Sequence, residues 1–240
     1  MQRAETALWA PVVVCHQLRS AENLGSIARV MANFGASKLV LSDPLTHDFR
    51  GAEQLAVGAE DVVRSVAVAQ SLDEALSKCV FAVGSTSRAE VPRVRALTPE
   101  EGAALLAEHS ARGPVALVLG GEKRGLSNDE LARCQAMVVI PTGEAQPSMN
   151  VASAAAVLLY ACARSQRAAA AEAEQGAPLE LVQRLEARAK EVLLRAEFLN
   201  PQAPDHVLRE LMRSLVKGKL TLREAELWLG AFEQLGRLPK

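Results

Sequence analysis

Short apolar runs rich in β-branched residues alternate with amphipathic runs over about the first 165 residues of this 240-residue chain. The apolar runs are short enough to be buried strands, and the runs between them repeat their apolar side chains with a helical period. Strands that alternate with helices indicate an α/β domain with a mainly parallel sheet and helices on both of its faces. We expect six strands, at residues 9–15, 38–42, 65–69, 79–84, 115–119 and 137–140.

The helical runs carry recognisable start and stop signals. In the first run, apolar residues follow the i, i+3, i+4, i+7 spacing from Ile27, and Gly35 is placed to end the helix. A Ser or Thr followed three residues later by Glu predicts a capping box, in which each side chain accepts a hydrogen bond from the other residue's backbone N–H. This pattern begins at Ser71, Thr98, Ser127 and Thr221.

The character of the chain changes after the apolar helix predicted at residues 150–164. The following segment is rich in Ala, Glu and Gln and ends in Gly-Ala-Pro, which is typical of a helix extension that runs into a linker. Three amphipathic helices are predicted beyond it, at residues 179–197, 204–216 and 221–235. We therefore expect an α/β domain over residues 1–167, a linker over 168–178 and a small all-helical extension over 179–240.

The composition excludes several classes of protein. With 49% hydrophobic residues the chain is not disordered, and its four cysteines form no C-x-x-C pair, so we expect buried, reduced thiols. The four histidines are scattered, which argues against a metal site. The longest apolar run, residues 151–163, is too short to cross a bilayer, and Glu5 lies where a signal peptide would be apolar. These features predict a cytoplasmic protein that binds no metal and no membrane.

The charge balance gives no sign of nucleic-acid binding for the chain as a whole, because the formal net charge is −1. Divided by segment, residues 1–167 contain 16 basic and 17 acidic side chains, whereas residues 181–240 contain 11 basic and eight acidic ones. The extension is therefore mildly basic. Solvated helix faces explain most segments of this kind, and a surface that faces RNA stays open.

In an open α/β sheet, ligands bind beyond the carboxyl ends of the strands, so the segments that follow strands are the places to search for a site. The first of these offers Ser20 or Asn23 as the cap of the next helix, and it places Arg29 within or just beyond the first helical turn. The planar guanidinium of an arginine suits a phosphate oxygen. An ordinary surface arginine on a capped helix is the alternative.

Two further segments follow buried strands. The one at residues 84–88 combines a glycine with small hydroxyl residues, so it could hold a nucleoside or a carboxylate, or it could be an ordinary polar loop. The one at residues 120–127 contains three glycines and Glu122, which predicts a tight, crowded site. It is not a P-loop, because Leu126 stands where that motif needs Lys, and no G-x-G-x-x-G occurs in the chain.

The last segment, residues 141–150, leads into a helix of small residues that would let another backbone pack closely against it. Either Ser148 or Asn150 is placed to cap that helix.

Taken together, these segments resemble the three motifs of the SPOUT-class RNA ribose 2′-O-methyltransferases. Asn23-Leu-Gly-Ser-Ile-Ala-Arg29 is similar to motif 1, and Leu-Gly-Gly-Glu122-Lys-Arg-Gly-Leu-Ser127 is similar to motif 2. Ile-Pro, followed by Ser148-Met-Asn150-Val-Ala-Ser-Ala, is similar to motif 3. Within this class the chain is most similar to the TrmJ branch of tRNA methyltransferases. That branch has Gly-Thr-Ser-Ala where this chain has Gly84-Ser-Thr-Ser, and it also carries a helical extension.

The resemblance implies a fold, a cofactor and an assembly that periodicity alone does not predict. The fold would be a sheet whose C-terminal segment forms a trefoil knot, and two copies would form a homodimer through the knot region. The cofactor would be S-adenosyl-L-methionine. Carried over residue by residue, the cofactor-binding residues would be Ser85, Thr86, Ser87, Gly120, Glu122, Ile140, Pro147, Ser148, Met149 and Asn150.

The resemblance also implies the catalytic residues, which would be Arg29, Asn23, Ser148 and Asn150. A guanidinium with a pKa above about 12 is a poor general base. We therefore expect Arg29 to bind a phosphate beside the target ribose, orient its hydroxyl and stabilise the developing alkoxide. The family resemblance implies an active site that combines Arg29 of one subunit with the cofactor loops of the other. Glu122 would have a structural or cofactor-side role, and no proton-transfer role is assigned to it.

The implied activity is transfer of a methyl group to the ribose 2′-hydroxyl of a tRNA nucleotide, with cytidine or uridine at position 32 of the anticodon loop as the expected target. Ribosomal RNA or another tRNA position is the alternative substrate. A dimer that binds RNA without catalysis is an alternative of another class, although the complete set of motif residues argues against it. A nucleotide-dependent oxidoreductase would need the glycine fingerprint that the chain lacks.

Overall fold

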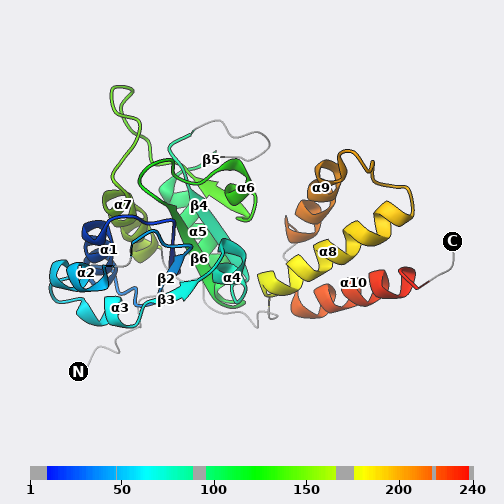
Figure 1. The fold of residues 1–240 in the computed structure, drawn as a ribbon, viewed down its shortest axis with the longest axis horizontal. Helices are drawn as coiled ribbons and strands as arrows, with labels where there is room; N and C mark the ends of the chain where they lie inside the picture. The colour runs from blue at the N-terminus through cyan, green and yellow to red at the C-terminus, as the bar shows by residue number, and fades with distance from the viewer. Residues whose placement is uncertain (1–9, 47, 89–95, 166–175, 218–219, 238–240) are drawn as a thin grey trace.

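The computed structural model describes residues 10–46, 48–88, 96–165, 176–217 and 220–237. A seven-stranded sheet in the order β3-β2-β1-β6-β4-β7-β5 forms its centre, with every neighbouring pair parallel (Figure 1). The strands are β1 (Val12–His16), β2 (Leu39–Ser42), β3 (Ala67–Ala69), β4 (Phe81–Ser85), β5 (Ala96–Leu97), β6 (Val115–Gly120) and β7 (Ala136–Val138). The predicted parallel α/β sheet is confirmed.

All six expected strands are present, with ends that differ by a few residues. The last ends at Val138 rather than at residue 140, although the Val139 N–H still donates to the Leu97 carbonyl at 2.9 Å. The edge strand β5 was not predicted, because two residues are too few to show an alternating pattern. Trp9, which begins the first expected strand, lies outside the described residues.

Helices cover both faces of the sheet, as predicted. Along β1, Val13 and Cys15 point into one apolar cluster and Val14 points into the other, which follows from the two-residue period of a strand. The first cluster contains residues of α1 (Ala21–Asn33), α2 (Phe49–Leu55), α3 (Glu60–Arg64), α5 (Pro99–Ser110) and α7 (Val151–Arg164). The second contains residues of α4 (Leu72–Leu76) and α6 (Asn128–Leu131). Because α2 and α3 are so short, periodicity did not predict them.

The capping boxes are confirmed at Thr98, Ser127 and Thr221. Ser71 caps α4 by accepting from the Glu74 N–H, but the Glu74 carboxylate accepts from Gln70 N at 2.7 Å instead of from the cap residue. The fourth predicted box is therefore half formed.

The C-terminal helices α8 (Leu179–Arg195), α9 (Pro204–Lys217) and α10 (Leu222–Leu235) pack around an apolar cluster of their own, beside the sheet (Figure 1). Residues 166–175, most of the predicted linker, lie outside the described part of the chain. The end of the predicted linker and the start of α8 are both hydrogen-bonded to the α/β part of the chain. Gly176 N donates to Arg112 O at 3.0 Å, and Leu179 N donates to Cys79 O at 2.7 Å. The domain limits themselves stay a prediction.

The sheet order places β7 between β4 and β5, which both precede it in the chain. The expected knot belongs to this region, and its threading stays a prediction. The four cysteines are free and buried, as expected, and burial raises the pKa of each thiol, to about 12 for Cys15. Among the described residues, no helix combines the length and the apolar character needed to span a membrane.

Candidate active site

Three adjacent strands carry predicted cofactor residues to the same edge of the sheet. Strand β4 lies between β6 and β7 and ends at Ser85, which is paired with Val138. Thr86 continues beyond the strand and donates its N–H to Val138 O at 3.0 Å. Because parallel strands end at one edge, the register brings Ser85 and Thr86 to the same level as Gly120 at the end of β6 and Ile140 just beyond β7.

The loop after β6 doubles back tightly on itself. A Cβ atom at Gly120 would lie 2.3 Å from the Gly125 carbonyl carbon and 2.4 Å from Leu126 N. A Cβ at Gly121 would lie 2.3 Å from Gln17 O, at the end of β1. Glycine is therefore required at both positions, which confirms the crowding predicted for this segment.

Glu122 ties this loop to the start of α1. Its carboxylate accepts hydrogen bonds from Arg19 N and Ser20 N, each at 3.0 Å, and from Asn23 Nδ2 at 2.9 Å. Partial burial raises the pKa of Glu122, but these bonds outweigh it and hold the pKa below its usual value. The carboxylate is therefore ionised at neutral pH and is a weak proton acceptor.

Asn23 is also hydrogen-bonded to Asn150, a residue of the third motif. Asn150 Nδ2 donates to Asn23 Oδ1 at 2.9 Å, while Asn150 Oδ1 accepts from Ala152 N at 2.8 Å and so caps α7. Of the two residues that were candidates for the cap of α1, Ser20 is the cap, and this leaves the Asn23 side chain for Glu122 and Asn150. The structure thus joins Glu122, Asn23 and Asn150, one residue from each motif.

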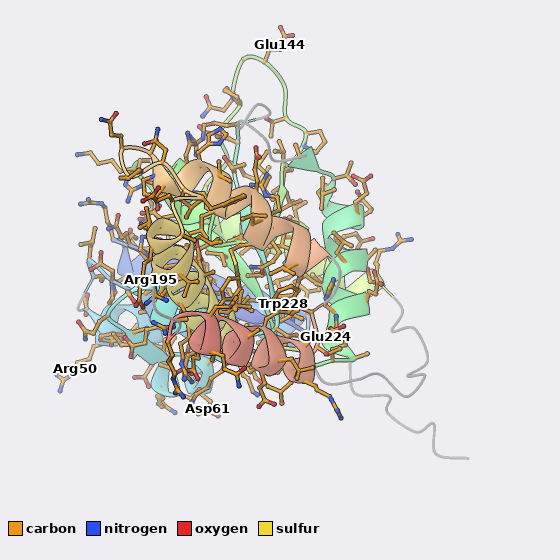
Figure 2. All side chains as sticks on the ribbon, turned by 90° about the vertical axis from the view of Figure 1, so that its right-hand side faces the viewer. Arg50, Asp61, Glu144, Arg195, Glu224 and Trp228 are labelled. Carbon is orange, nitrogen blue, oxygen red and sulfur yellow. The ribbon has the colours of Figure 1, made fainter. Side chains whose placement is uncertain are left out.

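The rest of the third motif lies apart from this network. Residues 141–150 are all exposed, and the loop they form projects from the sheet between β7 and α7 (Figure 1). Thr142 Oγ1 donates to Pro147 O at 3.0 Å within the loop, and Glu144 marks its tip (Figure 2). In the described part of the chain, Ser148 and Met149 make no hydrogen bond to residues of the other two motifs. Within the described residues, no hydrogen bond therefore ties Pro147, Ser148 or Met149 to the strand ends that carry Ser85 and Gly120.

Arg29 is exposed on α1. The helix begins at Ala21, so Arg29 lies in its third turn, further along than the sequence indicated. Within the described residues its guanidinium takes part in no side-chain hydrogen bond or ion pair. A surface guanidinium without an internal partner is available to a ligand outside the chain.

One contact of the site had no signal in the sequence. Arg88 Nη1 donates to Asn128 Oδ1 at 2.8 Å, and its Nη2 donates to Leu126 O at 2.5 Å. These bonds join the loop that contains Ser85, Thr86 and Ser87 to Leu126 in the turn before α6 and to the first residue of α6. Contacts between segments about 40 residues apart cannot be found from spacing.

The residues gathered at the edge fit the expected cofactor by their chemistry. Hydroxyl groups and backbone polar groups come from residues 85–87 and Gly120, with an apolar contribution from the half-buried Ile140. This set suits the ribose hydroxyls and purine of a nucleoside. In the described residues, no group of three or more His, Cys, Asp or Glu side chains could hold a metal ion.

Comparison with known proteins gives a consistent result. Residues 10–160 match the family described as the SpoU rRNA Methylase family. The chain is 32% identical over 226 residues to the tRNA (cytidine/uridine-2′-O-)-methyltransferase TrmJ of Yersinia pestis (strain Pestoides F), covering 91% of this chain and 88% of the relative. It is 34% identical over 214 residues to the TrmJ of Pectobacterium atrosepticum, and the match covers 87% of this chain and 89% of that relative.

Among solved structures, TrmJ from Z. mobilis ZM4 superimposes with a TM-score of 0.83 at 25% identity, covering 95% of this chain and all of that one. The match therefore extends over the helical extension as well as the sheet. The resemblance indicated by the three motifs is confirmed, and the chain belongs to the SpoU rRNA Methylase family, among its TrmJ-like members.

Proposed function

We propose that this protein transfers the methyl group of S-adenosyl-L-methionine to the ribose 2′-hydroxyl of a tRNA cytidine or uridine, at position 32 of the anticodon loop. The observation that carries the proposal is the hydrogen-bonded chain Glu122–Asn23–Asn150, which links all three motifs at one edge of the sheet. The relatives that match most of the chain carry the name tRNA (cytidine/uridine-2′-O-)-methyltransferase. A protein of this kind would act in the cytoplasm.

When bound, the cofactor supplies a methyl group already activated by the positive sulfonium. The protein therefore mainly has to align the 2′-hydroxyl and assist the loss of its proton. Arg29 is a poor base because a guanidinium stays protonated, and Glu122 is a poor base because its hydrogen bonds lower its pKa. In our proposal Arg29 binds a phosphate next to the target ribose, orients the hydroxyl and stabilises the alkoxide that develops.

The cofactor would lie against Ser85, Thr86, Ser87, Gly120 and Ile140, where the strand ends meet. For Pro147, Ser148 and Met149 to join this site, the projecting loop at residues 141–150 has to fold toward the sheet. The exposure of every residue of this loop supports such a movement, because few contacts would have to be broken. Asn150 is bonded to Asn23 and would act as the fixed end of that movement.

A second copy of the chain would pack on α1 and α7, which lie side by side (Figure 1). The outward face of α7 carries the small residue Ser153 and, two turns on, the half-exposed Tyr160, whose ring contacts Phe34 edge-on at 6.0 Å between centroids. Arg29 lies on the exposed side of the adjoining α1. This arrangement supports the proposal that Arg29 completes the site of the partner subunit and that the dimer forms through the knot region.

Ribosomal RNA is the second candidate substrate, because the matching family is described as a family of rRNA methylases. The helical extension favours tRNA, since the tRNA-methylating relatives are matched over 87–91% of this chain, which includes it. The mildly basic residues 181–240 would contact the tRNA outside its target nucleotide or support the dimer.

Transfer of labelled methyl groups tests the proposal. We expect incorporation from S-adenosyl-L-methionine into unmodified tRNA and none into deproteinised rRNA, whereas the non-catalytic dimer would label neither. Arg29→Ala should keep cofactor affinity but lose most of the single-turnover rate, and Arg29→Lys should recover little of it. Arg50→Ala, at an exposed arginine on α2, is the matched control and should leave the rate unchanged. A rate within a few-fold of wild type for Arg29→Ala would contradict the role of Arg29.

A further inference from the structure

A second polar cluster fastens the loop that carries Gly120 and Glu122, and its centre is Glu130 on α6. The Glu130 carboxylate accepts from both terminal nitrogens of Arg124, at 3.0 Å from Nη1 to Oε2 and 2.6 Å from Nη2 to Oε1. It also accepts from Ser127 N at 2.7 Å, as part of the capping box. Arg124 belongs to the loop itself, so this two-bonded pair holds the loop to the helix that follows it.

Glu130 is in turn fixed to the sheet. Its Oε1 lies 3.0 Å from His16 Nε2, and because a carboxylate can only accept, the imidazole donates there. The other ring nitrogen of His16 lies 3.0 Å from the buried Ser42 Oγ. His16 is 6% exposed at the end of β1, so the carboxylate is anchored to a rigid, buried position.

Arg124 also contacts the end of β1 directly. Its Nη2 donates to Gln17 Oε1 at 2.8 Å, and Gln17 Nε2 donates to Asp43 Oδ2 at 2.8 Å. Gln17 has a φ of 55°, in the left-handed region that disfavours a residue with a Cβ atom. This backbone brings Gln17 O to the place where a Cβ on Gly121 would lie 2.3 Å away, so the strained residue and the loop are in close contact.

We propose that Arg124 and Glu130 are positioning residues for methyl transfer: they hold the loop against the ends of β1 and α6 so that Gly120 and Glu122 keep their places at the cofactor site. The inference rests on the proposed function. Neither residue needs to touch the cofactor or the RNA, because each acts through the loop between them. Burial raises the pKa of Glu130, but its bonds to Arg124, Ser127 and His16 bring that pKa to about 2, so the pair stays charged at any assay pH near neutrality.

The test measures cofactor affinity in the absence of RNA, by titration calorimetry with S-adenosyl-L-methionine, for Arg124→Gln, Glu130→Gln and the double variant. We expect each single variant to bind about tenfold more weakly, which corresponds to about 1.4 kcal/mol. The cofactor affinity of the double variant should be little lower than that of the weaker-binding single variant, because both changes break the same Arg124–Glu130 contact. Arg124→Lys should recover part of the affinity, since it keeps the charge but not the paired hydrogen bonds.

Lys123→Gln is the matched control, because it removes the same charge from the neighbouring exposed position of the same loop. It should leave the cofactor affinity unchanged. Thermal unfolding of each variant without cofactor shows whether the protein is folded. Gln17→Ala is a milder change, because it removes the Gln17 bonds to Arg124 and Asp43 and leaves the Arg124–Glu130 pair in place.

Two results would overturn the inference. If the Arg124 variants keep wild-type cofactor affinity and lose only tRNA affinity, then Arg124 is an RNA contact. If melting temperature falls while cofactor affinity stays constant, then the Glu130 cluster only stabilises the fold. Because the affinity is measured without RNA, a wild-type protein that binds the cofactor but fails to methylate tRNA would contradict the proposed function and leave this measurement intact.

Discussion

Replacement of Glu122 by Gln perturbs the connection between the three motifs with almost no change in side-chain volume. In the native structure Oε1 accepts from Ser20 N and Asn23 Nδ2, and Oε2 accepts from Arg19 N. A glutamine oxygen can keep the two bonds of Oε1, but its amide nitrogen would then face Arg19 N, and two donors cannot pair. One bond to a charged acceptor is lost, and the remaining two lose their charge assistance.

The expected size of the effect follows from this count. A hydrogen bond to a charged group contributes about 1.5–3 kcal/mol, and the lower end applies because the Glu122 side chain is partly exposed and solvent screens its charge. About 1.5 kcal/mol corresponds to about tenfold. We therefore expect kcat/KM for methyl transfer to fall about tenfold in Glu122→Gln, and further in Glu122→Ala, which removes all three acceptor contacts.

The assay is single-turnover transfer of labelled methyl groups into unmodified tRNA at saturating and limiting cofactor concentration. Asp61→Asn is the matched control, because the Asp61 side chain is 97% exposed on α3 and the same change from carboxylate to amide occurs away from the network (Figure 2). Unfolding in urea shows whether the loss is one of stability. A Glu122→Gln protein that is stable and methylates at the wild-type rate would refute the role assigned to the network.

Three further predictions concern other parts of the molecule. His109 stacks on Phe81 with ring centroids 3.9 Å apart, and burial lowers its pKa from 6.5 to about 4. Between these values only the unfolded state takes up the proton, so the free energy of unfolding should fall by about 2–3 kcal/mol as pH drops from 6.5 to 4. His109→Gln should remove this contribution in urea titrations at each pH. Gly120→Val places side-chain atoms where the Gly125 and Leu126 backbone lies, so cofactor binding measured by calorimetry should be lost, whereas wild-type affinity would show that the loop is not crowded. Mixed dimers of Arg29→Ala and Gly120→Val subunits should regain methyl transfer if Arg29 completes the partner's site, and should stay inactive if both residues serve the same subunit.

The sheet could be predicted well because its strands are continuous buried runs with turns between them. Val13, Val14 and Cys15 show no alternation in hydrophobicity, since both faces of a covered parallel sheet are apolar. The strand β5 was beyond prediction, because Ala96 and Leu97 take part in the sheet only through their pairing with β7.

The sequence predicted individual residues of the candidate site but not the hydrogen bonds that join them. The motif pattern identified Asn23, Glu122 and Asn150, yet the bonds among them span 99 and 127 residues, and nothing in local spacing indicates such pairs. The Glu130 cluster was missed for the same reason: the Glu130 side chain was identified only as half of a capping box, and its contacts with His16 and Arg124 depend on the folded sheet.

The central claim is that the protein methylates the ribose of a specific tRNA nucleotide, and mass mapping of modified tRNA tests it most directly. Unmodified tRNA would be incubated with the protein and S-adenosyl-L-methionine, digested to fragments and searched for each added methyl group. We predict a 2′-O-methyl group on cytidine or uridine at position 32 of the anticodon loop, and none after incubation with Arg29→Ala. A methyl group on a base, in the D-loop or only in ribosomal RNA would contradict the account.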